Sequence, residues 1–281
     1  MTAMDFLESM AHSSRERCDA ARARCPDAEI ERIAAAASAP APLNLTHDGF
    51  DLIAEVKRSS PSAGQLAGAD LSPVEQAASY AAAGAAAISV LTEPSRFDGD
   101  LAHLESVAGE VAPVPAMRKD FLVAPYQVLE ARAAGASGVL LIAAMLDAAT
   151  LTDMLSATLD LGMFALVEAF DEADIEKSAP IMDAAGPVFD AARCRMMIGV
   201  NCRDLRSLQV DLPRFEKLAE YLPPGMPWIA ESGVTTPEQA AHVARIGYDL
   251  ALVGTALMRA EDPRAAANAL LDAGRAAAPT G

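Results

Sequence analysis

Positive charge is scarce in this sequence, and few of the cationic residues are lysines. The 281 residues carry 22 Lys and Arg against 39 Asp and Glu, a formal net charge of −17. Lysine occurs only as Lys57, Lys119, Lys177 and Lys217. No basic stripe offsets the negative charge, which excludes nucleic acid and anionic membrane surfaces as partners. An anionic ligand would need a local cluster of cations and backbone N–H groups.

Long apolar runs are missing too, although hydrophobic residues make up 52% of the chain. No run predicts a membrane span, and the charged residues 1–24 lack the apolar core of a signal peptide. The cysteines, Cys18, Cys25, Cys194 and Cys202, have no metal-ligand spacing, and a cytosolic chain of this size needs no disulfides. We therefore expect a cytoplasmic protein.

Two common kinds of site are also missing. The four histidines fall on predicted helices or in the early loop, and none follows a predicted strand. That position disfavours histidine acid–base chemistry and His-ligated zinc. No phosphate-loop or dinucleotide glycine fingerprint is present.

What the chain does contain, from residue 50 onward, is a repeat of short apolar runs and helical stretches. Continuous apolar runs are typical of parallel strands buried on both faces. There are eight of them: 51–56, 86–91, 114–118, 138–142, 163–168, 196–201, 227–231 and 249–253. Regular alternation with helices predicts a single α/β domain, a (β/α)₈ TIM barrel, in preference to an open doubly wound sheet.

The connecting segments have recognisable starts. Ser72 and Thr236 each precede a proline and Asp147 precedes a helical stretch, which predicts helices over 74–83, 238–246 and 148–161. Residues 2–38 are predicted to be helical, and we expect residues 1–49 to be an N-terminal extension of one domain spanning 1–281. The segment 178–195, with two prolines and a glycine, predicts an insertion near the fifth helix.

Polar side chains close most of the predicted strands. In this fold the active site lies at the carboxyl ends of the strands, so these residues should converge. They are Glu55 and Lys57, Thr92 and Glu93, Lys119 and Asp120, Glu168, Asn201 and Arg203, Glu231 and Ser232, and Gly254 and Thr255. A barrel that served only as a scaffold would not need this ring of ionisable groups.

Several of these positions have two interpretations. Glycines at 233 and 254 can form tight turns or bring backbone N–H groups to a phosphate, the position expected in this fold. The hydroxyl-rich segment 59–64 is either a surface loop or a loop that closes over an anion. Glu168 suits an ion pair with lysine, a general base, or both. Phe97 and Phe121 either pack a loop or line a pocket for a planar ligand.

Six segments resemble the signature segments of the indole-3-glycerol-phosphate synthase family. They are 53–62 (IAEVKRSSPS), 117–121 (MRKDF), 125–127 (PYQ), 166–168 (LVE), 199–205 (GVNCRDL) and 230–233 (AESG). The similarity runs in order from about residue 5 to residue 272. It implies a monofunctional TIM-barrel lyase of tryptophan biosynthesis that needs no metal or cofactor.

The resemblance implies a reaction and roles for particular residues. The reaction is closure of 1-(2-carboxyphenylamino)-1-deoxyribulose 5-phosphate to indole-3-glycerol phosphate, with loss of CO₂ and water. Lys119 resembles the general acid that protonates the ketose carbonyl. Glu168 and Lys57 resemble the base and acid of dehydration, and Glu55 the residue that orients Lys57. Asn201 and Ser232 complete the catalytic set.

The resemblance also implies how the substrate is held. Arg203 resembles a carboxylate-binding neighbour of Asn201, which positions the anilino end, and Glu231 a further substrate contact. The phosphate contacts implied are Ser60, Gly233, Gly254 and Thr255; the pocket walls implied are Phe97, Phe121, Leu140 and Leu205. Three features depart from the family: Cys202 where many members have asparagine, Asp100 where serine is common, and the 178–195 segment.

Two other classes stay open: a non-catalytic barrel that binds a phosphorylated metabolite or a protein, and a phosphosugar isomerase. An isomerase of the same pathway would need a Cys/Asp pair at strand ends, which Cys202 and Glu55 match poorly. A binder would have no reason to keep Lys57, Lys119 and Glu168 together. The expected partner is a small phosphorylated substrate, and the expected state is a monomer that associates at most weakly with other pathway enzymes.

Overall fold

Eight parallel strands close into a barrel in the computed structural model, which describes residues 3–46, 49–57, 59–60, 64–65, 72–190, 193–203 and 209–279. Neighbours around the barrel follow chain order, and the first strand pairs with the last. The strands are β1 Asp51–Val56, β4 Ala87–Leu91, β5 Ala116–Lys119, β6 Gly138–Ile142, β7 Phe164–Ala169, β10 Met196–Asn201, β11 Trp228–Glu231 and β12 Leu250–Val253. The predicted TIM barrel is confirmed.

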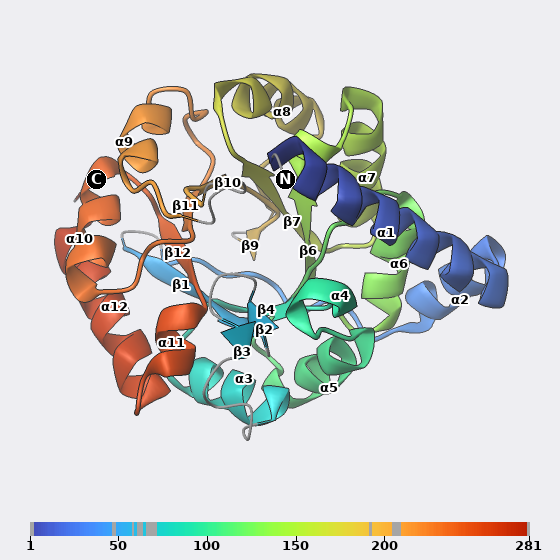
Figure 1. The fold of residues 1–281 in the computed structure, drawn as a ribbon, viewed down its shortest axis with the longest axis horizontal. Coiled ribbons are helices and arrows are strands. Elements are labelled where there is room, and N and C mark those ends of the chain that lie inside the picture. Colours follow the sequence, from blue (N-terminus) through green and yellow to red (C-terminus); the bar gives the residue numbers. More distant parts are fainter. Residues whose placement is uncertain are drawn as a thin grey trace.

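A ring of helices surrounds the barrel (Figure 1). One main helix follows each barrel strand: α3 Pro73–Ala82, α5 Leu101–Val111, α6 Pro125–Ala133, α7 Ala148–Asp160, α8 Glu172–Ala184, α9 Pro213–Ala219, α10 Pro237–Ile246 and α12 Pro263–Ala277. The predicted starts are confirmed, because Ser72 and Thr236 each form a capping box and Asp147 accepts from the Thr150 N–H. These bonds satisfy amides that the first helical turn leaves unpaired.

Shorter elements lie between the main ones. They are the helices α4 Pro94–Phe97, η1 Ala143–Met145 and α11 Thr255–Arg259, the strand pair β2 Ser59–Ser60 with β3 Gly64–Gln65, and the pair β8 Phe189–Asp190 with β9 Arg193–Cys194. None of the described helices is both long and apolar enough to cross a membrane.

The N-terminal region forms two helices instead of one continuous stretch, α1 Ala3–Arg24 and α2 Asp27–Ala36. Pro26 separates them, since proline has no N–H for the helix ladder and clashes with the preceding turn. Figure 1 shows α1 lying across the side of the barrel that carries α6 and α7.

The segment 178–195 was predicted as an insertion, and the prediction is wrong in its first part. Helix α8 continues through Pro180 to Ala184, and the segment beyond it contains the β8–β9 hairpin. The proline is tolerated because its missing N–H removes a single internal bond from the helix. An antiparallel bridge joins Leu43 to Cys194 in β9, and both side chains belong to the core inside the barrel.

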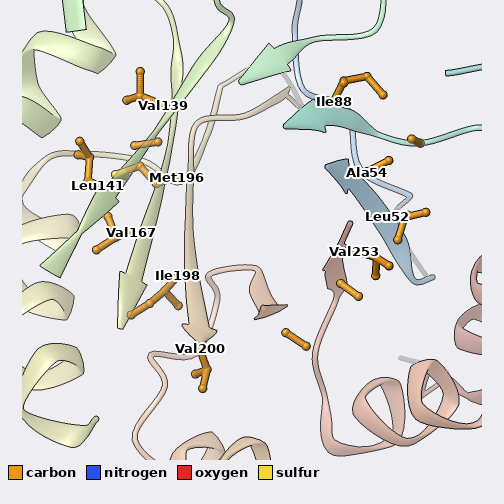
Figure 2. Close-up of a cluster of buried hydrophobic side chains, with 14 of the residues drawn as sticks. Leu52, Ala54, Ile88, Val139, Leu141, Val167, Met196, Ile198, Val200 and Val253 are labelled. Atoms are coloured by element: carbon orange, nitrogen blue, oxygen red, sulfur yellow. The ribbon is translucent and has the colours of Figure 1, made fainter. Parts of the chain in front are cut away.

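The core has two layers. Side chains on the outer face of the strands pack against the helices, as Figure 2 shows for Leu52, Ile88, Val139 and Val167. Side chains on the inner face fill the barrel, among them Ile53, Met117, Leu140, Leu166, Met197 and Ile229. Each large aliphatic side chain buried this way contributes about 1.5–3 kcal/mol. The filled interior makes the barrel a rigid support for the residues at its mouth.

Candidate active site

A pocket opens at the carboxyl ends of the barrel strands and collects most of the predicted site residues. The predicted residues that line it are Glu55, Lys57, Phe97, Lys119, Phe121, Leu140, Glu168, Asn201, Arg203, Glu231, Ser232, Gly233, Gly254 and Thr255. Ser60 is described only as part of β2, and Leu205 lies outside the described residues. Parallel strands deliver their last residues to the same rim, so positions far apart in sequence meet here.

Lys119 lies among carboxylates at the end of β5. Its Nζ is 3.3 Å from Glu168 Oε2 and 3.2 Å from Glu231 Oε2. Burial disfavours the charged amine, but Glu168, Glu231 and Glu55 outweigh it and hold the pKa of Lys119 above its usual range. Lys119 therefore keeps its proton and its positive charge at neutral pH.

Glu231 is the least favourably placed of these acids for carrying a charge. Burial, together with the nearby Glu168, raises its pKa well above the ordinary value even though Lys119 opposes the shift. Its Oε1 atom is buried and has no hydrogen-bond partner within the described part of the chain. This oxygen lies against Gly199 of β10, where an added Cβ would clash with it, so it faces the neighbouring strand.

Glu55 and Lys57 form a second charged pair, at the end of β1. The Lys57 Nζ donates to Glu55 Oε1 at 2.6 Å. Burial opposes ionisation of Glu55, but Lys57 and Lys119 outweigh burial and lower its pKa. Glu55 thus stays ionised and fixes the direction of the Lys57 ammonium.

Asn201 and Arg203 stand at the end of β10. The Asn201 Oδ1 accepts the backbone N–H of Arg203 at 3.0 Å, and the Asn201 carbonyl accepts from Arg214 Nη1 at 3.1 Å. With Oδ1 engaged, the amide nitrogen of Asn201 is the group left to donate to a ligand.

The loops after β11 and β12 bring backbone close to the pocket. Ser232 and Gly233 both have positive φ, +64° and +85°. Gly254 lies against the β1 pair, since a Cβ there would be 2.4 Å from Glu55 Oε1 and 3.1 Å from Lys57 Nζ. Only glycine lets the backbone approach this closely.

Aromatic rings form one wall. The rings of Phe97 and Phe121 have centroids 6.2 Å apart, and Phe6 meets Phe121 edge-on at 6.0 Å. Phe6 and Leu7 come from α1, and Phe170 follows β7; all three line the pocket and were not predicted. Phe6 and Leu7 lie in the segment predicted to be helical, but nothing in the sequence indicated what that helix covers.

Two strand-end residues, Thr92 and Glu93, turn out to support the site from behind. Thr92 Oγ1 donates to Asp120 Oδ2 at 2.8 Å, and Glu93 caps α4 by accepting from the N–H groups of Ser95 and Arg96. Thr92 and Glu93 are absent from the pocket lining, whereas Asp120 contributes to it. Asp100, a departure from the family pattern, caps α5 by accepting the Ala102 N–H, as a serine would.

The assembled groups suit acid–base chemistry on an anion with a flat apolar part. A lysine can give a proton, a carboxylate beside it can take one, and the aromatic wall excludes water. Among the described residues, no three His, Cys, Asp or Glu side chains come together to hold a metal ion. Fold and pocket together define the class, a (β/α)₈-barrel enzyme with its site at the strand ends.

Known proteins narrow this class. The family profile described as "Indole-3-glycerol phosphate synthase" matches residues 7–270. An indole-3-glycerol phosphate synthase of Mycobacterium leprae (strain Br4923) is 46% identical over 245 residues, 86% of this chain and 85% of that protein. One of Mycobacterium ulcerans (strain Agy99) is 43% identical over 278 residues, 98% and 96% of the two chains. The chain belongs to the indole-3-glycerol phosphate synthase family, as its motifs predicted.

Solved structures share the fold. A 3-hexulose-6-phosphate synthase from Salmonella typhimurium has a TM-score of 0.61 at 13% identity, over 80% of this chain and 98% of that one. At this identity the likeness concerns the barrel alone.

Proposed function

We propose that this chain is an indole-3-glycerol-phosphate synthase, a decarboxylating lyase of tryptophan biosynthesis. Its substrate is 1-(2-carboxyphenylamino)-1-deoxyribulose 5-phosphate, and its products are indole-3-glycerol phosphate, CO₂ and water. The observation that carries the proposal is the Lys119 ammonium, held among Glu168, Glu231 and Glu55 in a pocket of this family's barrel.

Lys119 serves as the general acid of ring closure. The aromatic carbon that bears the carboxylate attacks the ketose carbonyl carbon, and the carbonyl oxygen takes the Lys119 proton to become a hydroxyl. The carboxylate then leaves as CO₂, and the electrons of its bond restore the ring. Glu168 and Glu231 keep the ammonium charged and aimed into the pocket.

Glu168 and Lys57 serve in the dehydration that follows. Glu168 takes a proton from the new ring, and Lys57 gives one to the hydroxyl that leaves as water. Glu55 holds Lys57 at 2.6 Å, so the acid of this step is oriented in advance.

The remaining residues bind the two ends of the substrate. Asn201 and Arg203 take the anilino and carboxylate end, Glu231 is a further substrate contact, and Ser232 belongs with Asn201 to the catalytic set. The phosphate is held by Gly233, Gly254, Thr255 and Ser60, and the aromatic ring by Phe97, Phe121, Leu140 and Leu205. Local donors of this kind offset the repulsion of a chain with net charge −17.

We further propose a cytoplasmic monomer with residues 1–49 as an extension of one domain over 1–281. Four free cysteines fit a reducing compartment. The large apolar side chains exposed in the described part of the chain, Phe189, Val210 and Tyr221, come from three separate segments.

The test is an assay for indole fluorescence after the purified chain is mixed with the synthetic ketose phosphate. We expect fluorescence to grow with enzyme concentration in the parent and in Lys217→Ala, an exposed control lysine on α9. A parent that binds the ketose phosphate without converting it would favour the non-catalytic barrel instead.

A further inference from the structure

Cys202 joins the two pocket loops that follow β10 and β11. It lies between Asn201 and Arg203, and its buried Sγ donates to the Ser232 carbonyl at 3.0 Å. Its N–H donates to the Glu231 carbonyl at 3.1 Å, and its carbonyl accepts from the Asp211 N–H at 2.8 Å. One residue therefore connects the loop proposed for the carboxylate with the loop proposed for the phosphate.

The loop after β11 has a backbone that needs such support. Ser232 adopts φ +64°, which is unfavourable for a residue with a Cβ, and Gly233 follows at +85°. Gly233 lies directly on the neighbouring loop, since a Cβ there would be 2.8 Å from Cys202 Sγ and 2.6 Å from Val210 Cγ1. Residues in such conformations persist when surrounding contacts hold them.

The same segment is turned toward a ligand. Ser232, Gly233 and Val234 all line the pocket. The direction of the amides after Glu231 depends on the φ of Ser232 and Gly233. Whatever fixes these two angles fixes the donors offered to an anion.

We propose that Cys202 is a positioning residue, which holds Ser232 and Gly233 in their left-handed conformation through its Sγ–H···O=C bond and thereby prepares the phosphate subsite. It touches no reacting atom and acts through Ser232 and Gly233. The proposal rests on the proposed function only for the identity of the phosphorylated substrate. The anion subsite itself is argued from the loop geometry.

The chemistry of a buried thiol suits this task. Burial raises the pKa of Cys202 to about 12, although Arg214 and Arg203 oppose the shift. The thiol therefore remains a neutral donor across the working pH range, and it is a poor nucleophile there. A serine at this position would keep a donor, whereas alanine or valine would remove it.

The experiment compares Cys202→Ala and Cys202→Val with Cys202→Ser. The readouts are KM and kcat for the ketose phosphate and the affinity for inorganic phosphate, followed by phosphorus NMR titration. Losing one hydrogen bond should weaken phosphate binding and raise KM roughly three- to tenfold in the Ala and Val variants. The kcat should stay within about twofold, and Cys202→Ser should behave like the parent within about twofold.

Cys194 provides a matched control at the other end of the barrel. Its buried Sγ donates to the Met196 carbonyl at 3.3 Å, beside the barrel's amino end. Cys194→Ala should lose a similar bond and similar stability, with phosphate affinity and KM unchanged. A thermal melt of every variant separates loss of the subsite from loss of the fold.

Two results would overturn the inference. One is a folded Cys202→Ala or Cys202→Val with parent-like phosphate affinity and KM; the other is a Cys202→Ser that loses phosphate as the Val variant does. If the Ala variant does not fold, the Val and Ser pair decides. A parent that never converts the ketose phosphate sinks the proposed function alone, because the phosphate titration still tests Cys202.

Discussion

Lys119 shows how a residue gains a role from its neighbours. An isolated lysine inside a protein tends to lose its proton, since burial disfavours the charged form. Here Glu168 and Glu231 lie within 3.3 Å and 3.2 Å of its Nζ, and they reverse that tendency. The same carboxylates hold the ammonium in one place, so it can meet a carbonyl oxygen without rearrangement.

The residue-scale prediction concerns Gly254. A methyl group there would come within 2.4 Å of Glu55 Oε1 and 3.1 Å of Lys57 Nζ, so Gly254→Ala must displace the pair. Misplacing a catalytic group by about 1 Å can cost up to about 10²-fold, and we expect kcat/KM to fall by roughly 10- to 100-fold. Steady-state kinetics measure this, with circular dichroism to check the fold.

Gly109→Ala is the control, because a Cβ at Gly109 in α5 meets nothing within 4 Å and its φ is ordinary. Its activity should equal that of the parent. A parent-like kcat/KM in Gly254→Ala would mean that catalysis does not depend on the geometry of the Glu55–Lys57 pair.

Most charged groups of the site could be predicted from the sequence, because each directly follows an apolar run. A charged side chain at the end of a buried apolar strand can reach solvent or a ligand only at the mouth of the barrel. Glu55, Lys119 and Glu168 could therefore be identified as site residues from the sequence. Thr92 and Glu93 satisfied the same rule yet bond to Asp120 and to α4, because which polar strand-end residue faces the pocket depends on the twist of the barrel.

At the scale of elements, β5 is tied to its surroundings by a buried ionic network. Asp120 accepts two hydrogen bonds of 2.9 Å from Arg17 of α1 and one of 3.2 Å from Arg118 Nη2. Arg118 also reaches the Gln127 carbonyl in α6 at 2.9 Å. The network fixes the strand end that carries Lys119 and anchors α1 beside it.

This network predicts a pH dependence of folding stability. Burial opposes ionisation of Asp120, but Arg118, Arg17 and the Phe121 N–H lower its pKa from 3.8 to about 2. A carboxyl with a depressed pKa stabilises the fold above its unfolded pKa, here by about 2 kcal/mol, and loses this as pH falls from 3.8 toward 2.

Asp120→Asn tests it by urea unfolding. The variant removes the carboxylate that Arg118 and Arg17 share, while Arg118 keeps Glu130 at 3.4 Å and the Gln127 carbonyl, so we expect a loss of about 2–3 kcal/mol above pH 4 that narrows toward pH 2. Asp190→Asn breaks an exposed pair with Arg193, 3.0 Å long, and should cost about 1 kcal/mol or less at every pH. A stability difference between the parent and Asp120→Asn that stays constant from pH 5 to pH 2 would contradict the assignment.

The ends of the helices were harder to predict from the sequence than the existence of the helices themselves. Pro26 divides the N-terminal helix, whereas Pro180 is accommodated inside α8, and sequence alone does not distinguish the two. The difference is set by packing, because α8 buries Ile175, Ser178 and Met182 around the proline. Contacts of that kind outweigh one missing hydrogen bond.

At the scale of the whole molecule, the barrel could be predicted because the sequence repeats one unit, an apolar strand followed by a helix. Eight apolar runs alternating with helices leave few ways to bury every strand on both faces, and closing the sheet removes its edges. The placement of α1 could not be predicted, because it depends on long-range contacts such as the pair of Phe6 with Phe121. The closed barrel in turn brings residues 55 to 255 to one pocket.

The central claim is that Lys119 gives the proton that allows ring closure, and a rapid-quench time course tests it most directly. Parent, Lys119→Ala, Lys119→Arg and Lys217→Ala are mixed with the ketose phosphate in single turnover. We expect kcat to fall by about 10²–10⁴ in both Lys119 variants, with substrate binding weakened far less, and no change in Lys217→Ala. Arginine should not rescue activity, since a guanidinium keeps its proton near neutral pH. Turnover near the parent rate in both Lys119 variants would contradict the claim.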